Sequence, residues 1–190
     1  MNMITVVGLF DHYSDADDAV HALQDYGVAS NRISIVTRDN DTIERGTLAR
    51  AGLAGGAATG GMVGLLAGLS AMVVPGIGPV IATGTLAAAL AAAIGMTAAG
   101  AGIGAAAGGL LGALVDLGLS EQDADFFAEG VKRGGIVVLV EADVEDDDEI
   151  SDILNGAGAV DVHIRRRSWQ NAGWIPFAEA ERSGEDAYRR

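Results

Sequence analysis

A long central segment, from residue 51 to residue 115, contains no Asp, Glu, Lys, Arg or His. The same segment holds most of the 28 glycines of the chain, together with many alanines. All charged residues therefore lie in two flanks, one before the segment and one after it. In a chain of 190 residues, this division predicts two charged units with an apolar unit between them.

The two flanks are acidic, and the chain carries a formal net charge of −14. This charge argues against general electrostatic binding of nucleic acid, so no nucleic-acid partner is expected. The chain has no cysteine, which excludes disulfides, thiolate metal sites and thiol catalysis. The first residues lack the basic and apolar regions of a signal peptide, so a cytoplasmic location is expected for the flanks.

The N-terminal flank has the pattern of a strand, a helix and a second strand. Residues 4–10 are rich in β-branched side chains, which favour strands. Ser14 is a suitable N-cap for a helix, and Gly27 is a suitable residue to end it. Residues 32–37 form the second predicted strand.

The C-terminal flank predicts a helix, a strand, a short helix and a last strand. Ser120 begins the first helix, and residues 136–140 form a strand of the buried type. Residues 150–154 carry the apolar positions of the short helix. The last strand is predicted from the alternating apolar residues Val160, Val162 and Ile164.

Together the flanks predict an α+β fold, a ferredoxin-like βαβ-αβαβ sandwich that is split by a long insertion. Each flank alone offers too little apolar surface for a stable core, so the two halves are expected to fold together. The predicted units are residues 1–46 and 119–166 for the two halves, 47–118 for the insertion, and 167–190 for a C-terminal tail.

Glycines recur every four residues in two parts of the insertion. They are Gly52, Gly56, Gly60, Gly64 and Gly68 in the first series and Gly100, Gly104, Gly108 and Gly112 in the second. Between the series, a turn is predicted at Pro75, Gly76, Gly78 and Pro79. Since glycine weakens an isolated helix, this spacing is typical of helices whose backbones pack closely. The insertion is therefore predicted to be a glycine-zipper helical hairpin that serves helix packing and oligomerisation.

Two environments suit such a hairpin. Residues 51–74 and 96–115 are long enough to cross a bilayer, and two spans would keep both flanks on the cytoplasmic face. Alternatively, the arms pack in the shared core of a soluble homo-oligomer. Membrane lipid is slightly favoured as the partner, and a homo-oligomer is expected in either case.

No residue pattern indicates catalysis, a cofactor or a metal site. The three histidines, His12, His21 and His163, lack the spacing of metal ligands. The acidic run at 143–149 lacks the glycine of a calcium-binding loop and suits the start of a helix. The glycines at 102–104 and 55–60 lack the residues that complete nucleotide-binding motifs.

The C-terminal region adds a basic triplet and an apolar stripe. Arg165, Arg166 and Arg167 suit either a solvated strand end or a contact with anionic lipid or an acidic neighbouring subunit. The apolar residues Trp169, Trp174, Ile175 and Phe177 suit docking on the protein's own or a neighbouring domain, or an interfacial membrane anchor.

Three stretches of sequence also resemble a known family. The N-terminal ITVVGLFDHYSDADDAVHALQDYGV resembles the general stress protein 17M-like, or YflT-type, domain. The segments AMVVPGIGPVIATGTLAAALAAA and GAAAGGLLGALVDLGLSEQDADFFAEGVKRGGIVVLV are similar to bacterial low temperature-induced relatives of that family. The resemblance covers about residues 3–166 and implies a general stress response with no known active-site residues.

These observations predict a non-enzymatic stress-response protein that self-associates, anchors in the membrane, or does both, through the glycine-zipper hairpin. The alternative is a module that binds or senses a small ligand on a soluble homo-oligomeric scaffold. The sequence does not identify such a ligand.

Overall fold

The computed structural model describes residues 3–38, 70–74, 77–97 and 105–176. The strands are β1 (Met3–Phe10), β2 (Ile33–Arg38), β3 (Ser70–Val74), β4 (Gly78–Ala82) and β5 (Ile136–Asp143). The α-helices are α1 (Tyr13–Tyr26), α4 (Gly84–Thr97), α5 (Ala105–Asp116), α6 (Glu121–Lys132), α7 (Asp147–Gly156) and α8 (Val162–Asn171). Two short 3₁₀ helices are η1 (Ser30–Arg32) and η2 (Val144–Asp146).

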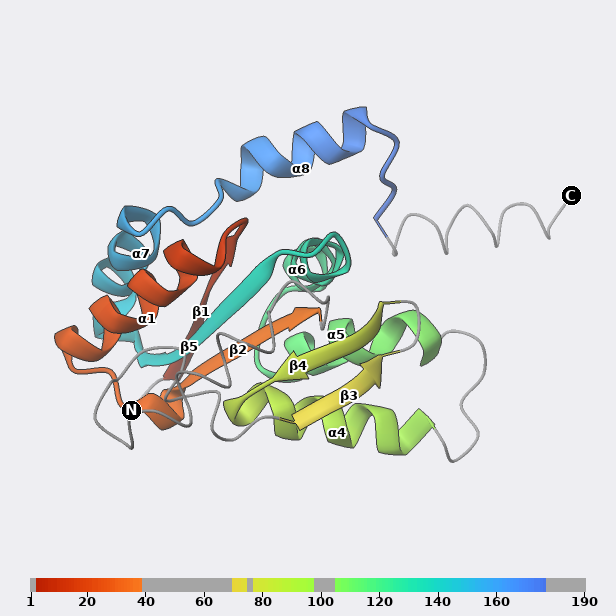
Figure 1. Cartoon of the computed structure of the whole chain (residues 1–190), viewed down its shortest axis with the longest axis horizontal. Helices are drawn as coiled ribbons and strands as arrows, with labels where there is room; N and C mark the ends of the chain where they lie inside the picture. The colour runs from red at the N-terminus through yellow and green to blue at the C-terminus, as the bar shows by residue number, and fades with distance from the viewer. Residues whose placement is uncertain (1–2, 39–69, 75–76, 98–104, 177–190) are drawn as a thin grey trace, which may run out of the picture.

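The five strands form one sheet with the order β1-β5-β2-β4-β3 (Figure 1). Every neighbouring pair is antiparallel. As a result, β1 and β2 run parallel to each other, with β5 between them. This is the split βαβ arrangement, in which β1 and β2 come from the N-terminal flank and β5 from the C-terminal flank.

Helices cover both faces of the sheet. On one face, α1 and α7 enclose a core that includes Phe10, Leu23 and Val138. On the other face, α4, α5 and α6 enclose a second core that includes Leu90, Phe126 and Leu139. Because β5 is covered on both sides, its first five residues, 136–140, form a continuous apolar run instead of an alternating one.

The first two elements of the insertion that the structure describes are strands. Ser70–Val74 and Gly78–Ala82 form an antiparallel hairpin, and β4 extends the sheet by pairing with β2. The prediction of two helical arms joined at 75–79 is therefore wrong on both sides of the turn. The physical reason is the concentration of β-branched residues there, which fit a pleated sheet better than a helix.

The predicted last strand is also wrong, because its residues Val162 and Ile164 belong to helix α8. Asp161 explains the difference, since its side chain accepts a hydrogen bond from the Ile164 backbone N–H at 2.8 Å and caps the helix. Only Val160 approaches the sheet, donating its backbone N–H to Leu9 at 2.7 Å. The prediction of a mixed α and β fold is confirmed, whereas the complete ferredoxin-like arrangement is not.

The insertion is joined to the rest of the domain at the start of α4. The Thr83 hydroxyl accepts a hydrogen bond from the Ile35 backbone N–H at 3.0 Å, and the Thr83 N–H donates to Ile35 at 2.9 Å. The Ser34 hydroxyl lies 3.1 Å from the Thr85 hydroxyl. Between these contacts, Gly84 has a φ of +65°, and a Cβ there would lie 2.9 Å from the Ile33 carbonyl oxygen. Glycine is therefore required where α4 begins against β2.

None of the described helices combines the length with the apolar character that a membrane-spanning segment needs.

We expect Gly84→Ala to lower the free energy of unfolding by about 2 kcal/mol or more, through backbone strain and the clash with β2. Urea unfolding followed by circular dichroism would measure the effect. The matched control is Gly156→Ala at the end of α7, where a Cβ would meet no atom within 4 Å. Equal stability of the two variants would contradict the inferred role of Gly84.

Candidate functional site

Only part of the predicted glycine zipper lies within the described residues. Outside them lie Gly52, Gly56, Gly60, Gly64, Gly68, Gly100 and Gly104, together with Pro75 and Gly76 of the predicted turn. Gly108 and Gly112 lie in α5, and Gly78 and Pro79 begin β4. The role of these glycines in helix packing therefore stays a prediction.

The described part of the insertion has a leucine side and a small-residue side. Leu86 and Leu90 of α4 and Leu110 and Leu114 of α5 are fully buried in the core beneath the sheet. Within residues 84–92 of α4, where the structure describes side chains, the exposed positions are Gly84, Ala88, Ala91 and Ala92. A Cβ at Gly112 of α5 would meet no atom within 4 Å, so that side of α5 is open in the single chain.

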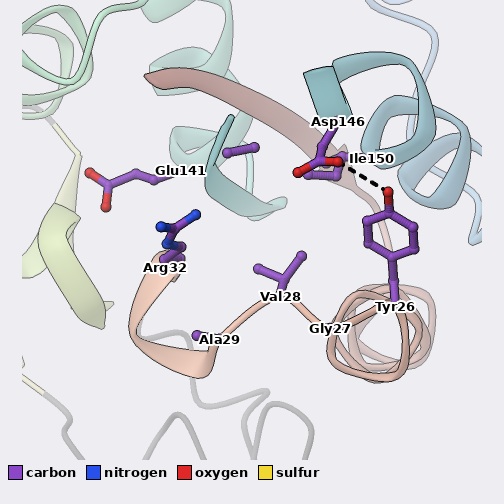
Figure 2. Close-up of a pocket in the computed structure, with 9 residues that line it drawn as sticks. Tyr26, Gly27, Val28, Ala29, Arg32, Glu141, Asp146 and Ile150 are labelled. Carbon is purple, nitrogen blue, oxygen red and sulfur yellow. Dashed lines mark hydrogen bonds between the residues drawn. The ribbon is translucent and has the colours of Figure 1, made fainter. Parts of the chain in front are cut away.

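A groove of about 400 Å³ lies on the other side of the molecule, between the α1–β2 connection and the β5–α7 connection (Figure 2). It is lined by Tyr26, Gly27, Val28, Ala29, Arg32, Glu141, Ala142, Asp146 and Ile150. Gly27 has a φ of +114° and turns the chain out of α1 into the wall of the groove. The two flanks thus build this groove jointly.

Polar groups stand on two sides of the groove. The Tyr26 hydroxyl donates a hydrogen bond to Asp146 at 3.2 Å, and Arg32 lies across from this pair (Figure 2). Partial desolvation and the carboxylates of Asp146 and Glu149 raise the pKa of the Tyr26 phenol. Arg32 also donates a hydrogen bond of 3.5 Å to Asp143 Oδ2.

One buried acceptor beside the groove lacks a partner. Asp143 Oδ1 is shielded from solvent and accepts no hydrogen bond from the part of the chain that the structure describes. Buried acceptors are nearly always satisfied, so this atom is an exception among the described residues. Sequence reasoning missed this groove because its residues come from loops of both flanks. One signal was available in the sequence. A helix that ends at Gly27 is followed by a strand of the buried type, and Arg32 stands at the start of that strand.

The basic triplet lies on α8, where two of its arginines contact the protein's own domain. Arg165 makes two hydrogen bonds to the Asp11 carboxylate, at 2.9 and 2.5 Å. Arg166 donates to Asp123 Oδ1 at 2.8 Å. The prediction of a solvated strand end is therefore wrong, because the triplet is helical and its ion pairs are internal.

The aromatic residues beside the triplet complete this contact, which we call the α8 clasp (Asp11, Asp123, Phe126, Arg165, Arg166 and Trp169). Trp169 is buried and stacks on Phe126 with ring centroids 4.9 Å apart. Trp174 meets Trp169 edge to face at 5.9 Å. Docking of this stripe on its own domain is thus observed for both tryptophans, while Phe177 lies outside the described residues.

The clasp shifts the acidity of its carboxyl groups. The hydrogen bonds from Arg165 lower the pKa of Asp11 against a smaller opposing effect of burial. Burial acts to raise the pKa of Asp123, but hydrogen bonds from Ser120 and Arg166 outweigh it, so the pKa of Asp123 is lowered. Both carboxylates are therefore stabilised in their charged form by the folded structure.

The remaining polar candidates stand apart from one another. His12 precedes α1, His21 lies on α1 and His163 lies on α8. The His21 ring nitrogen Nδ1 lies 3.0 Å from the Asp17 carbonyl oxygen of the same helix. The acidic run forms the end of β5, η2 and the first turn of α7, where carboxylates favour the helix N-terminus. Within the described ranges, no group of three or more His, Cys, Asp or Glu residues is placed to hold a metal ion.

The clasp predicts an acid-sensitive position for α8. Because the pKa of Asp11 is lowered on folding, its ion pair stabilises the fold above the unfolded pKa of about 3.9, and this contribution disappears as the pH falls through the folded pKa. Asp11→Asn should remove about 0.2–1 kcal/mol of stability at pH 7, the range of exposed ion pairs, and should lessen the loss in acid. Trp169 and Trp174 are the two tryptophans of the chain, so intrinsic fluorescence reports on α8.

Asp18→Asn on the exposed side of α1 is the control, because it removes the same charge away from the clasp. If Asp11→Asn matched the wild type in urea unfolding at pH 7, the ion pair would have no role in docking α8.

The comparisons with known proteins agree with the N-terminal part of the resemblance. Residues 5–73 match the family model described as the heat induced stress protein YflT domain. The matched stretch contains most of β1, all of α1 and β2, and most of β3. A search of curated proteins and a search of solved structures found no match. Residues 5–73 of this chain are therefore similar to the heat induced stress protein YflT domain.

Proposed function

We propose that this protein is a non-enzymatic stress-response protein that associates with other copies of itself through its Gly- and Ala-rich insertion. The single observation that carries the proposal is the uncharged outer side of α4, which exposes Ala88, Ala91 and Ala92. A soluble helix normally presents charged or polar residues to water. Here the acidic residues of the chain lie elsewhere, and the exposed positions described in residues 84–92 of α4 carry only glycine and alanine.

The shape of this side favours another helix as the partner. Alanine and glycine leave a smooth surface that a second helix backbone can approach closely. Ala88, Ala91 and Ala92 are spaced three and four residues apart and thus lie on one side of α4. Gly112 on α5 adds a second open position that lacks a side chain. The predicted zipper at Gly52–Gly68 and Gly100–Gly112 would enlarge the same kind of surface.

The leucine side chains of α4 and α5 point into the core, and this favours self-association over insertion into a bilayer. The side chains that lipid would attract, Leu86, Leu90, Leu110 and Leu114, are fully buried against the sheet and α6. The side that remains for a partner is made of alanine and glycine, which gain little from contact with lipid. The experiment must therefore distinguish self-association from membrane anchoring.

We expect Ala91→Glu to weaken self-association by roughly tenfold or more, because association would bury an unpaired carboxylate. The residue is exposed in the single chain, so the variant should fold. Sedimentation equilibrium of the full-length protein in buffer without detergent would measure the effect. The matched control is Gln122→Glu on the exposed side of α6, which adds the same charge outside the surface.

A protein that sediments as a monomer at all concentrations in buffer would contradict self-association. Recovery only with membranes, and only in detergent, would instead favour the bilayer as the partner. Equal weakening by Ala91→Glu and Gln122→Glu would show that total charge, and not the surface of α4, controls the association.

A second candidate function, binding of a small molecule, is favoured by the groove beside Tyr26. Its volume of about 400 Å³ is within the range of ligand sites. Arg32 can bind an anionic group, while Asp146, which also lines the groove, can accept a hydrogen bond from a donor. A molecule that carries both an acid and an amine would fit this arrangement.

A thermal-shift series with free α-amino acids, simple carboxylates and simple amines tests this candidate. We expect saturable stabilisation by the amino acids, reaching about 2.7 kcal/mol at a hundred times the dissociation constant. Arg32→Gln should abolish it, whereas Arg167→Gln on the exposed part of α8 should not. Absence of a saturable shift, or a shift that Arg32→Gln leaves unchanged, would contradict the groove as a binding site.

A further inference from the structure

Among the described strands, β1 forms one end of the sheet and pairs only with β5. Its sequence, MITVVGLF, contains no charged residue and no proline. Proteins usually protect such an edge with charges, prolines, bulges or a covering segment, because unpaired backbone groups attract another strand. The outer edge of β1 therefore needs a physical explanation.

The hydrogen bonds show which backbone groups point outward. Val160 donates its N–H to the Leu9 carbonyl at 2.7 Å from outside the sheet. Since backbone groups alternate in direction along a strand, Thr5 and Val7 point outward like Leu9, as does Met3 at the strand start. Val6 and Gly8 point inward and pair with Val140 and Val138 of β5.

The outer edge is closed at one end and open at the other. At the closed end, the Leu9 carbonyl already accepts a hydrogen bond from the Val160 N–H. Ala159 lies beside Gly8, since a Cβ added at Gly8 would be 3.5 Å from the Ala159 side chain. At the open end, no backbone hydrogen bond from the described residues reaches the outward groups of Met3, Thr5 or Val7. Met3 is also half exposed, at 50%. The helical fold of residues 162–171 leaves this stretch without the fourth strand expected from the sequence.

We propose that the open edge of β1 pairs with β1 of a second copy, antiparallel and around a two-fold axis at Thr5. In this register Thr5 faces Thr5, and Met3 faces Val7 of the other copy. Each of the three facing pairs exchanges two backbone hydrogen bonds. The two sheets then continue into one another through a self-complementary interface.

The occupied carbonyl of Leu9 selects this register. Pairing centred on Val6 would bring Leu9 opposite Met3 and would require the carbonyl that Val160 already uses. Centring the pair on Thr5 uses only the three outward residues that remain open. The Thr5 hydroxyl donates to the Leu117 carbonyl of its own chain, so this pairing depends on the backbone groups.

The symmetry of the open edge favours a second copy over another kind of strand, because its three open residues centre on Thr5 and an identical antiparallel strand offers each of them a partner. The net charge of −14 on each copy opposes association, but β1 itself adds no carboxylate to the interface. Remaining repulsion between the acidic domains is screened by salt, so the dimer should tighten as ionic strength rises. This interface lies on the opposite end of the sheet from β3 and does not depend on the proposed surface of α4.

Single-cysteine variants test the register directly, because the chain has no other cysteine. In the proposed dimer, the Cα atoms of the two Thr5 residues lie about 5.5 Å apart, within reach of a disulfide. The two Met3 residues lie about 14 Å apart along the strands, beyond that reach. We expect Thr5→Cys to form a covalent dimer under mild oxidation and Met3→Cys to remain largely monomeric. Both variants carry Ala91→Glu to remove association through α4.

The wild-type protein gives a second measurement that needs no variant. Hydrogen exchange followed by NMR should show the outward amides of Thr5 and Val7 becoming protected as protein concentration and salt increase. The inward amide of Val6 should be protected at all concentrations. The proposal is overturned if the amides of Thr5 and Val7 stay unprotected in the concentrated pure protein, as they would if a different protein supplied the strand. It is equally overturned if Met3→Cys cross-links as readily as Thr5→Cys.

Discussion

The position of β5 between β1 and β2 is the constraint on which the rest of the structure depends. The strand pairs along its length with β1, from Met3↔Asp143 to Phe10↔Ile136, and with β2 on its other side. This pairing joins two flanks that a long insertion separates in sequence. It also forces the insertion to leave β2 and to return to α6 beside the same sheet. The hydrogen bonds of Thr83 with Ile35, together with the close approach of Gly84 to β2, fix the path of that return.

The sequence was sufficient for the elements whose local signals agree with their packing. The β-branched run of β1, the Ser120 cap of α6 and the apolar run of β5 each predicted the observed element. Two predictions failed where a longer-range pattern was given more weight than a local one. The four-residue glycine spacing suggested a helical hairpin, but Val74, Val80 and Ile81 around the turn favour strands. The alternation of Val160, Val162 and Ile164 suggested a strand, but the Asp161 side chain caps a helix there.

The candidate sites were less accessible to sequence reasoning because they depend on contacts between distant residues. Arg165 meets Asp11 and Arg166 meets Asp123 only because α8 crosses from α7 toward α6. Arg32 and Asp146 face the same groove only because β2 and β5 are neighbours. The glycines also differ in the space that surrounds them. Gly84 and Gly135 are needed inside the fold, where a Cβ would lie 2.9 Å and 3.0 Å from carbonyl oxygens, whereas Gly112 faces open space. Spacing alone could not separate these roles.

The cap at Asp161 links two features that otherwise look unrelated. By starting α8 at Val162, it carries Trp169 onto Phe126 and brings the arginines to their carboxylates, so the α6 side of the core is covered. The same helix withdraws the residues that would have formed a fourth strand beside β1. Along that edge, the described residues outside the sheet supply one backbone hydrogen bond, from Val160 to Leu9. By starting α8, Asp161 therefore helps to cover the aromatic core and also leaves the outer edge of β1 from Met3 to Val7 without a strand beside it. This is the edge at which a second copy can continue the sheet.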